Sequence, residues 1–168
     1  MSEISVRVLG EEEWERYKEF RLKALKESPE AFVADFDTEA AYEDKFWRKR
    51  MRRSARLLAE CEDRPVGIVS LRKSQELFEN SAEIFGLWVV QSLRGTGIAA
   101  SLVEAAASAA NAEGHTQLVY WVGTDNGRAV AFASSYGFRP TEHRRPMAQQ
   151  GSDDDGDEEL AMVLALSR

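Results

Sequence analysis

The chain has 168 residues and a formal net charge of −7 at pH 7, with 43% hydrophobic and 30% charged residues. This length and balance fit one globular domain with a real core, so we expect residues 1–168 to form a single domain. The acidic balance disfavours nucleic acid as a partner and mildly favours cationic ones. No stretch has the composition of a signal peptide or a membrane span, so we expect a soluble, cytoplasmic protein with no membrane partner.

Strands and helices are predicted from the spacing of apolar residues. Alternating or continuous short apolar runs indicate strands, and apolar residues three and four positions apart indicate helices. Pro29 and Gly137 are helix stop signals. The predicted elements, in chain order, are a strand at 4–9, helices at 11–29 and 37–53, strands at 55–63, 64–74 and 81–90, a helix ending near Gly114, a strand at 116–123, a helix at 126–137, and strands at 138–148 and 159–167. This order predicts a mixed α/β sheet.

One apolar strand runs through a glycine-rich corner straight into a helix, in the stretch VVQSLRGTGIAASLVEAA at 89–106. Backbone N–H groups at a helix start have no partner within the helix, and the helix dipole adds partial positive charge there. Gly95 and Gly97 let the backbone approach an anion closely, and Arg94 adds a charge that can reach a phosphate. The corner therefore favours a phosphorylated ligand, although a turn without a ligand remains open.

Two other phosphate-binding motifs fit this corner poorly. A P-loop requires Lys followed by Ser or Thr after its second glycine, and Ile98 and Ala99 stand there instead. The stretch GTGIAA satisfies the dinucleotide fingerprint, but that motif belongs in the first strand–helix turn, with an acid about 20 residues further on. Here several elements precede the corner, and Tyr120 occupies the acid's place.

Two segments together resemble the GCN5-related N-acetyltransferase (GNAT) superfamily. The first matches the pattern R-x-x-G-x-A after an apolar strand, and the second matches N-x-R-A before an aromatic helix that ends in G-F. The matching residues are Arg94, Gly97 and Ala99, then Asn126, Arg128, Ala129, Phe132, Gly137 and Phe138. The resemblance implies a single-domain α/β (α+β) fold, with a mixed, mostly antiparallel seven-stranded sheet flanked by about four helices.

The same resemblance implies an enzyme that moves an acetyl group from acetyl-CoA to a primary amine by direct attack, without a metal. The acceptor would be a small molecule, an antibiotic, or a peptide or protein amine, and the protein a monomer or homodimer. The corner would hold the pyrophosphate, and the preceding strand would splay from the next so that pantetheine lies between them. The residues expected to bind acetyl-CoA are Leu87, Trp88, Val89, Val90, Arg94, Gly95, Thr96, Gly97, Ile98, Ala99, Ala100, Asn126, Ala129 and Phe132.

The catalytic residues are less well marked. Glu83 alternates with Phe85, Leu87 and Val89, so strict period-2 geometry places it on their face. A carboxylate in an apolar cleft there could remove the amine proton, directly or through water, while a surface ion pair is the alternative.

The family's usual acid, a tyrosine that protonates the leaving thiolate, is replaced by Ala133, which leaves Tyr136, Ser134 or water. A non-catalytic acyl-CoA-binding or regulatory module is therefore the rival hypothesis.

The remaining polar clusters carry weaker expectations. His115 and His143, with Cys61, are too few for a structural zinc site, so we expect surface histidines and a small core cysteine. The acidic run at 153–159 would overlie the acceptor mouth in this family and attract a polyamine, aminoglycoside or lysine-rich peptide, or else form a solvated hairpin tip. The basic runs WRKRMRR and EHRRP predict mostly solvated faces, with Arg144 and Arg145 as an alternative site for an acidic acceptor.

Overall fold

The computed structural model describes residues 3–32, 34–74, 78–146 and 158–166, and these build one seven-stranded sheet. The strands lie in the order β1-β2-β3-β4-β5-β7-β6, and every neighbouring pair is antiparallel except β4–β5. Their bounds are β1 Ile4–Val8, β2 Ala55–Cys61, β3 Arg64–Lys73, β4 Ser81–Val89, β5 Gln117–Gly123, β6 Arg139–Pro146 and β7 Glu158–Ala165. The mixed, mostly antiparallel seven-stranded sheet predicted from the sequence is confirmed.

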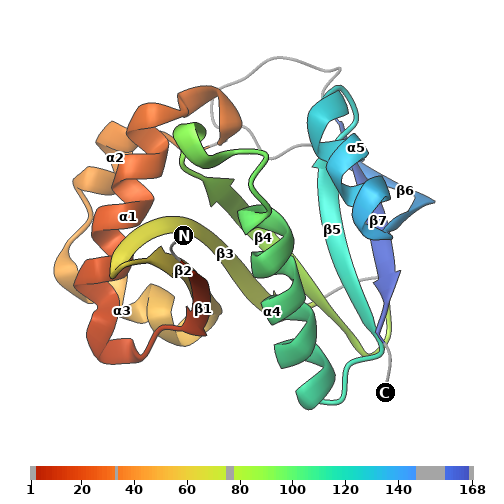
Figure 1. The fold of residues 1–168 in the computed structure, drawn as a ribbon, viewed down its shortest axis with the longest axis horizontal. Helices are drawn as coiled ribbons and strands as arrows, with labels where there is room; N and C mark the ends of the chain where they lie inside the picture. The colour runs from red at the N-terminus through yellow and green to blue at the C-terminus, as the bar shows by residue number, and fades with distance from the viewer. Residues whose placement is uncertain (1–2, 33, 75–77, 147–157, 167–168) are drawn as a thin grey trace.

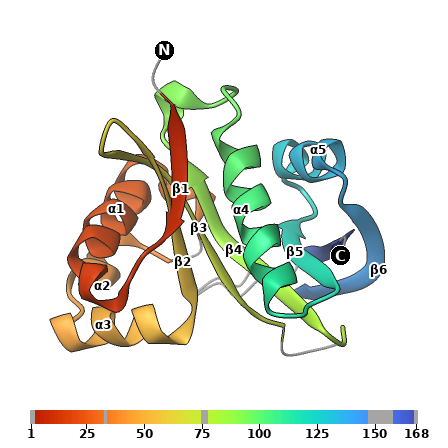
Figure 2. The same cartoon turned by 60° about the horizontal axis from the view of Figure 1, so that its bottom comes forward.

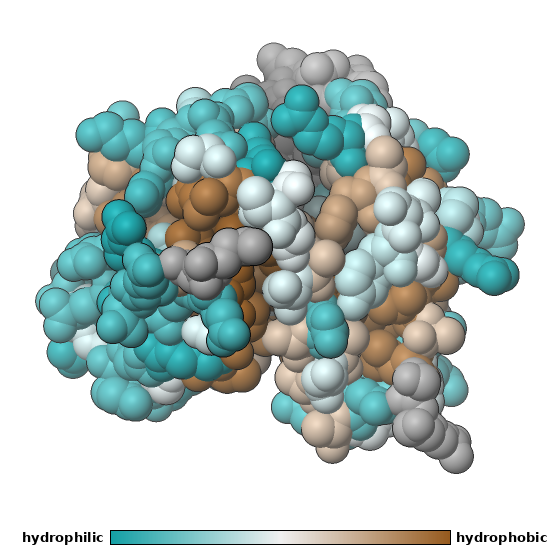
Figure 3. Space-filling model, in the orientation of Figure 1, coloured by the Kyte–Doolittle hydropathy of each residue, from teal (hydrophilic) through white to brown (hydrophobic). Residues whose placement is uncertain are grey.

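Five α-helices surround the sheet within the described residues. They are α1 Trp14–Glu27, α2 Phe36–Ala40, α3 Asp44–Arg53, α4 Ile98–Ala112 and α5 Gly127–Tyr136. Helices α1, α2 and α3 lie on one side of strands β2–β4, α4 lies on the other side, and α5 lies beside β5 and β6 (Figures 1 and 2). The surface over α1–α3 is mostly hydrophilic (Figure 3). None of the helices in the described part of the chain is long and apolar enough to cross a membrane.

Helix α4 is held to the sheet by one apolar face. The face predicted from the sequence is buried as expected, because residues three and four apart share one side of a helix. Its members are Ile98, Leu102, Val103, Ala106 and Ala110, each at most 2% exposed. On β3, the lack of a side chain at Gly67 leaves space for α4, since an added Cβ would lie 2.9 Å from the Leu102 side chain. Close packing here fixes the start of α4 relative to the sheet.

The helix predicted at 37–53 is wrong, because two helices occupy that range. Asp35 caps α2, its side chain accepting a hydrogen bond from the Thr38 N–H at 2.7 Å. The backbone leaves the helical conformation at Glu43, which has φ −70° and ψ 158° and begins α3. The break lets Glu39 turn inward, where it is 2% exposed and ion-paired with Arg21 and Arg50.

Strand β4 does not alternate as the sequence suggests. Phe85 packs under the Arg56 guanidinium, which also lies over Tyr17 of α1, and Trp88 packs edge-on against Phe20 of α1. Both rings therefore face α1 although they are three residues apart, which strict alternation forbids. A bulge explains this, because Gly86 has φ +66° and the β3–β4 register shifts between Ile68 and Ser70.

The bulge corrects the predicted neighbours of Glu83. Val89 lies opposite Gly67, which faces α4. Glu83 shares the α1 side with Phe85, where the Arg72 guanidinium contacts both side chains. The expectation that Glu83 shares one face with Leu87 and Val89 is therefore wrong.

The expectations for Cys61, for the two histidines and for the acidic run concern residues away from the centre of the sheet. Cys61 is only partly buried, at the edge of the core, and both histidines are intermediate in exposure rather than fully on the surface. No metal-binding group of histidine, cysteine and acid side chains occurs among the described residues. Of the acidic run, residues 153–157 lie outside the described residues, and Glu158 and Glu159 begin β7.

Candidate active site

Strands β4 and β5 run side by side for only part of their length. Their parallel pairing extends from Ser81 opposite Gln117 to Ile84 opposite Tyr120, and both strands continue beyond it. Figure 1 shows the two strands diverging toward their carboxyl ends, at the end of the sheet where α4 and α5 begin. Residues 85–89 of β4 consequently pair with β3 alone, so one edge of this segment is open to an extended ligand backbone.

The glycine corner stands at the carboxyl end of β4. Gly95 and Gly97 have φ values of +82° and +93°, and Gly97 is the N-cap of the 15-residue helix α4. Within the described chain, the backbone N–H groups of residues 95–100 donate no hydrogen bond. A Cβ built on either glycine would meet nothing within 4 Å, so the approach to these N–H groups is open. Six free donors at a helix start form a seat for an anion such as a phosphate.

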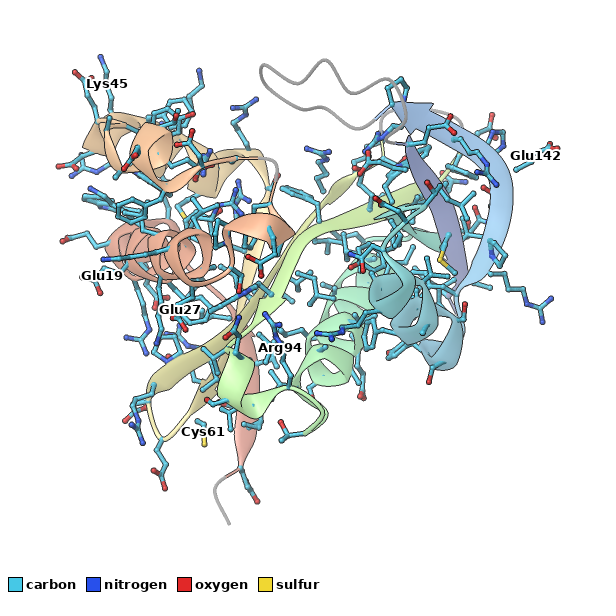
Figure 4. All side chains as sticks on the ribbon, turned by 90° about the horizontal axis from the view of Figure 1, so that it is seen from above. Glu19, Glu27, Lys45, Cys61, Arg94 and Glu142 are labelled. Carbon is cyan, nitrogen blue, oxygen red and sulfur yellow. The ribbon has the colours of Figure 1, made fainter. Side chains whose placement is uncertain are left out.

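Ser28, a buried residue that sequence reasoning missed, connects α1 to the glycine corner. Ser28, the C-cap of α1, accepts hydrogen bonds at its Oγ from Trp88 Nε1 at 3.0 Å and from Arg94 Nη2 at 3.3 Å. Arg94 also donates from Nε to the Val89 carbonyl oxygen at 3.2 Å. Figure 4 labels Arg94 between the turn before α4 and the end of α1. The hydrogen bonds of the Arg94 side chain thus fix the position of the corner, and its positive charge lies beside the N–H groups that could bind an anion.

The far side of the opening begins with helix α5. Asn126, predicted to contact acetyl-CoA, caps this helix, and its Oδ1 accepts the Ala129 N–H at 3.1 Å. Ala129 and Phe132 are half-buried on α5, and the Phe132 ring lies 6.4 Å from that of Tyr136. Asn126 therefore stabilises the start of α5, which follows β5 at the end of the sheet where β5 diverges from β4.

Glu83 lies at the base of the opening and has a charged partner. Its Oε2 accepts hydrogen bonds from Arg72 Nη2 at 2.8 Å and from Arg72 Nε at 3.1 Å, across the β3–β4 ladder. The side chain is 7% exposed, so it is neither in an apolar cleft nor in a surface ion pair. Among the described residues, no donor reaches Oε1.

The three positions considered for a general acid differ in burial. Ala133 is fully buried and offers no hydroxyl, and Ser134 is exposed on α5. Tyr136 is half-buried near the Phe138 ring, and burial, together with the negative charge of Glu104 on α4, raises the pKa of its phenol. Tyr136 is therefore protonated at neutral pH and has a proton to give.

The arginines of the basic runs do not behave alike. Arg50 is half-buried and ion-paired with Glu39 at 2.8 Å, which corrects the expectation of a mostly solvated face at this position. Arg145 is ion-paired with Glu159 at 2.7 Å and stacks on Trp121. A cavity of about 200 Å³ between α1, α3 and the sheet is lined by five arginines, a cluster that sequence reasoning missed.

The model of the acetyltransferase (GNAT) family matches residues 12–138, three quarters of the chain. The chain belongs to the GNAT acetyltransferase family. It is therefore a transferase. No curated protein matches the sequence significantly.

Solved GNAT-like structures share the fold at low identity. YncA of Salmonella typhimurium, solved with its cofactor acetyl-CoA, is 17% identical with a TM-score of 0.69, over 98% of this chain and 94% of that one. A ribosomal-protein-alanine N-acetyltransferase of Brucella melitensis is 20% identical with a TM-score of 0.69, over 96% and 99% of the two chains. A probable acetyltransferase of Staphylococcus epidermidis is 15% identical with a TM-score of 0.75, over 98% and 100%.

The region matched to the GNAT family contains every residue that was predicted to be catalytic or to bind acetyl-CoA. It runs from the start of α1 to Phe138, so it includes Glu83, the corner and all of α5. Strands β6 and β7 lie outside it. Ser28 and the arginine-lined cavity also fall within the matched region, on the side of the sheet away from α4.

Proposed function

We propose that this GNAT protein transfers an acetyl group from acetyl-CoA to a primary amine by direct attack. One observation carries the proposal: six N–H groups at the start of α4, which have no acceptor among the described residues, stand beside an open edge of β4. The first feature suits a pyrophosphate and the second suits an amide-containing chain, and CoA carries both. The relative solved with acetyl-CoA supports this assignment.

Each part of the opening would hold a different part of the cosubstrate. The N–H groups of residues 95–100 would hold the pyrophosphate, with the Arg94 charge beside them. The backbone of residues 87–90 would pair with pantetheine as an added strand, and Asn126, Ala129 and Phe132 would bound the far side. The bound thioester supplies an activated acetyl group. A backbone N–H near the Gly86 bulge would bond its carbonyl oxygen as negative charge develops there.

The reaction itself is a single displacement at the acetyl carbon. The neutral amine nitrogen forms a new C–N bond, the C–S bond breaks, and the electron pair leaves with sulfur. Oε1 of Glu83 takes the amine proton, directly or through a water, because Oε2 is already held by Arg72. Tyr136, whose pKa is raised by burial, or water protonates the thiolate.

Turnover on a panel of amines tests the proposal. Purified protein is mixed with acetyl-CoA and each amine, and the released thiol is measured over time. Amine-dependent thiol release with a matching acetylated product is expected. Binding of CoA without thiol release on any amine would favour the rival hypothesis of a non-catalytic acyl-CoA-binding module.

A further inference from the structure

The arginine-lined cavity lies on the α1 side of the sheet and reaches the bulge of β4. Its lining includes Gly86 and a cluster of five arginines from α1, α3, β2 and β3. The arginines are Arg21, Arg50, Arg53, Arg56 and Arg72. Gly86 belongs to the β4 segment whose other edge is open to acetyl-CoA, so a molecule in the cavity lies next to the thioester in the proposed complex. The cavity is therefore positioned to hold the acetyl acceptor.

Within the part of the chain that the structure describes, the arginines of the cavity outnumber the carboxylates that pair with them. Arg21 and Arg50 share Glu39, with N–O distances of 3.1 Å and 2.8 Å, and Arg72 is paired with Glu83. Among the described residues, no carboxylate lies within ion-pair distance of Arg53 or Arg56. Five guanidinium groups thus face two carboxylates, in a protein whose net charge is −7. Among the described residues, the cavity therefore carries a local surplus of positive charge, which a bound anion could neutralise.

Arg56 is the most unusual member of the cluster. It is only 6% exposed and lies between the rings of Tyr17 and Phe85. Its hydrogen bonds go to neutral acceptors, the Ser70 hydroxyl at 2.7 Å and the Arg50 carbonyl oxygen at 3.1 Å. A buried charge without a counter-ion is strongly disfavoured, so a bound anion would relieve it.

The burial of Arg56 has an electrostatic consequence. Desolvation, with repulsion from Arg50, Arg21 and Arg72, lowers the pKa of the Arg56 guanidinium against the opposing effect of Tyr17. Arginine nevertheless stays protonated at neutral pH. The packing around Arg56 therefore keeps a fixed positive charge in a site of low polarity, where an ionic hydrogen bond is strong.

We propose that the acceptor is a small amine that carries a carboxylate, which Arg56 and its neighbouring arginines bind while the amino group faces Gly86. This inference rests on the proposed acetyl transfer. A guanidinium binds a carboxylate through two parallel hydrogen bonds, and a cavity of about 200 Å³ suits a molecule of amino-acid size. Polyamines and other polycations are disfavoured, because the arginines would repel them.

Matched pairs of acceptors test the proposal. The standard amino acids, β-alanine and their carboxamides are each supplied with acetyl-CoA, and kcat/KM is measured by thiol release. The best carboxylate-bearing amine should exceed its own carboxamide by about 10- to 100-fold, the range of a hydrogen bond to a charged group. The carboxamide's amine is the less basic of the two, so more of it is neutral at a given pH, which biases the comparison against the proposal.

Two further acceptors and three variants separate the possible outcomes. O-phosphoethanolamine supplies a phosphate in place of the carboxylate, and spermidine supplies only positive charge. Arg56→Met should abolish the preference for the acid over its amide. Arg53→Gln, on the exposed end of α3, should reduce it without risk to the fold. Arg52→Gln is the matched control, because Arg52 is on the same helix and pairs with Glu11 but does not line the cavity.

The results distinguish this inference from the proposed function. Turnover of carboxamides or spermidine at rates equal to or above those of the acids would overturn the carboxylate proposal and leave acetyl transfer standing. A preference for O-phosphoethanolamine over every amino acid would replace the carboxylate by a phosphate. An unchanged preference in both cavity variants would show that the anion is not bound by these arginines. No thiol release with any amine would instead contradict the proposed function.

Discussion

Replacing Gly97 by Glu places a carboxylate in the anion seat at the start of α4. Gly97 has φ +93°, and a side chain there costs about 1–2 kcal/mol of stability because L-residues disfavour the left-handed region. Gly114, at the other end of the same helix, has φ +91° and equally open surroundings, so Gly114→Glu is a matched control for strain. The helix dipole favours an anion at the first position and not the second, by about 0.3–1 kcal/mol. Unliganded Gly97→Glu should therefore be at least as stable as Gly114→Glu.

The two variants should differ in their response to CoA. Ligand at 100 times its dissociation constant stabilises a protein by about 2.7 kcal/mol. For a chain of this size, that raises the melting temperature by about 5–10 °C. Thermal unfolding with and without CoA should show this rise for the wild type and Gly114→Glu, and none for Gly97→Glu. A normal rise in Gly97→Glu would refute the placement of the pyrophosphate, and an equal loss in Gly114→Glu would show that the effect is general destabilisation.

Three other predictions address catalysis and stability. Glu83→Gln should lower kcat by about 10²–10⁴-fold while acetyl-CoA affinity stays unchanged. The loss of rate should shrink as pH rises, because more of the amine is already neutral. A rate near that of the wild type at neutral pH would assign the role of base to water. Ser28→Ala should lower the free energy of unfolding in urea by about 1–3 kcal/mol, because the buried Trp88 Nε1–H loses its acceptor, whereas an unchanged value would mean that water replaces the hydroxyl. Hydrogen bonds from the Arg7 side chain and the Gly10 N–H lower the pKa of Glu13 to about 2. The ionised Glu13 therefore contributes to folding stability above the unfolded pKa of about 4.5, and this contribution is lost as pH falls toward 2. The difference in the free energy of unfolding between the wild type and Glu13→Gln should vanish over that interval, and a difference that persists at pH 2 would contradict this.

The corner and the last helix were predictable from the sequence because their signals are local. Glycines at positive φ, a long helix without breakers, and an asparagine cap lie within a few residues of one another. The apolar face of α4 follows from spacing alone, since every buried member obeys the helical period. The divergence of β4 from β5, which pair over only four residues, was expected from the family resemblance rather than from any pattern in the strands; the extent of the pairing was not predicted.

The bulge and the arginine cavity were not predictable in the same way. A glycine inside a strand is a known signal of a bulge, yet Gly86 fits an alternating pattern well enough to hide the change of face. The arginines of the cavity come from three stretches of the chain, at residues 21, 50–56 and 72, which meet only in the folded protein. Part of this contact depends on sheet register, which places Arg56 on β2 opposite Ser70 on β3. No local pattern marks Arg56, and only the tertiary structure shows that it is buried and that none of the described carboxylates pairs with it.

Calorimetric titration of CoA and acetyl-CoA into the protein tests the central claim most directly, because it needs no knowledge of the acceptor. The six N–H groups at the start of α4, for which the described residues supply no acceptor, and the open strand edge predict one site per chain with micromolar affinity. Removing the phosphates should abolish binding, so pantetheine alone should give no measurable heat. Absence of CoA binding to protein that circular dichroism shows to be folded would contradict the account.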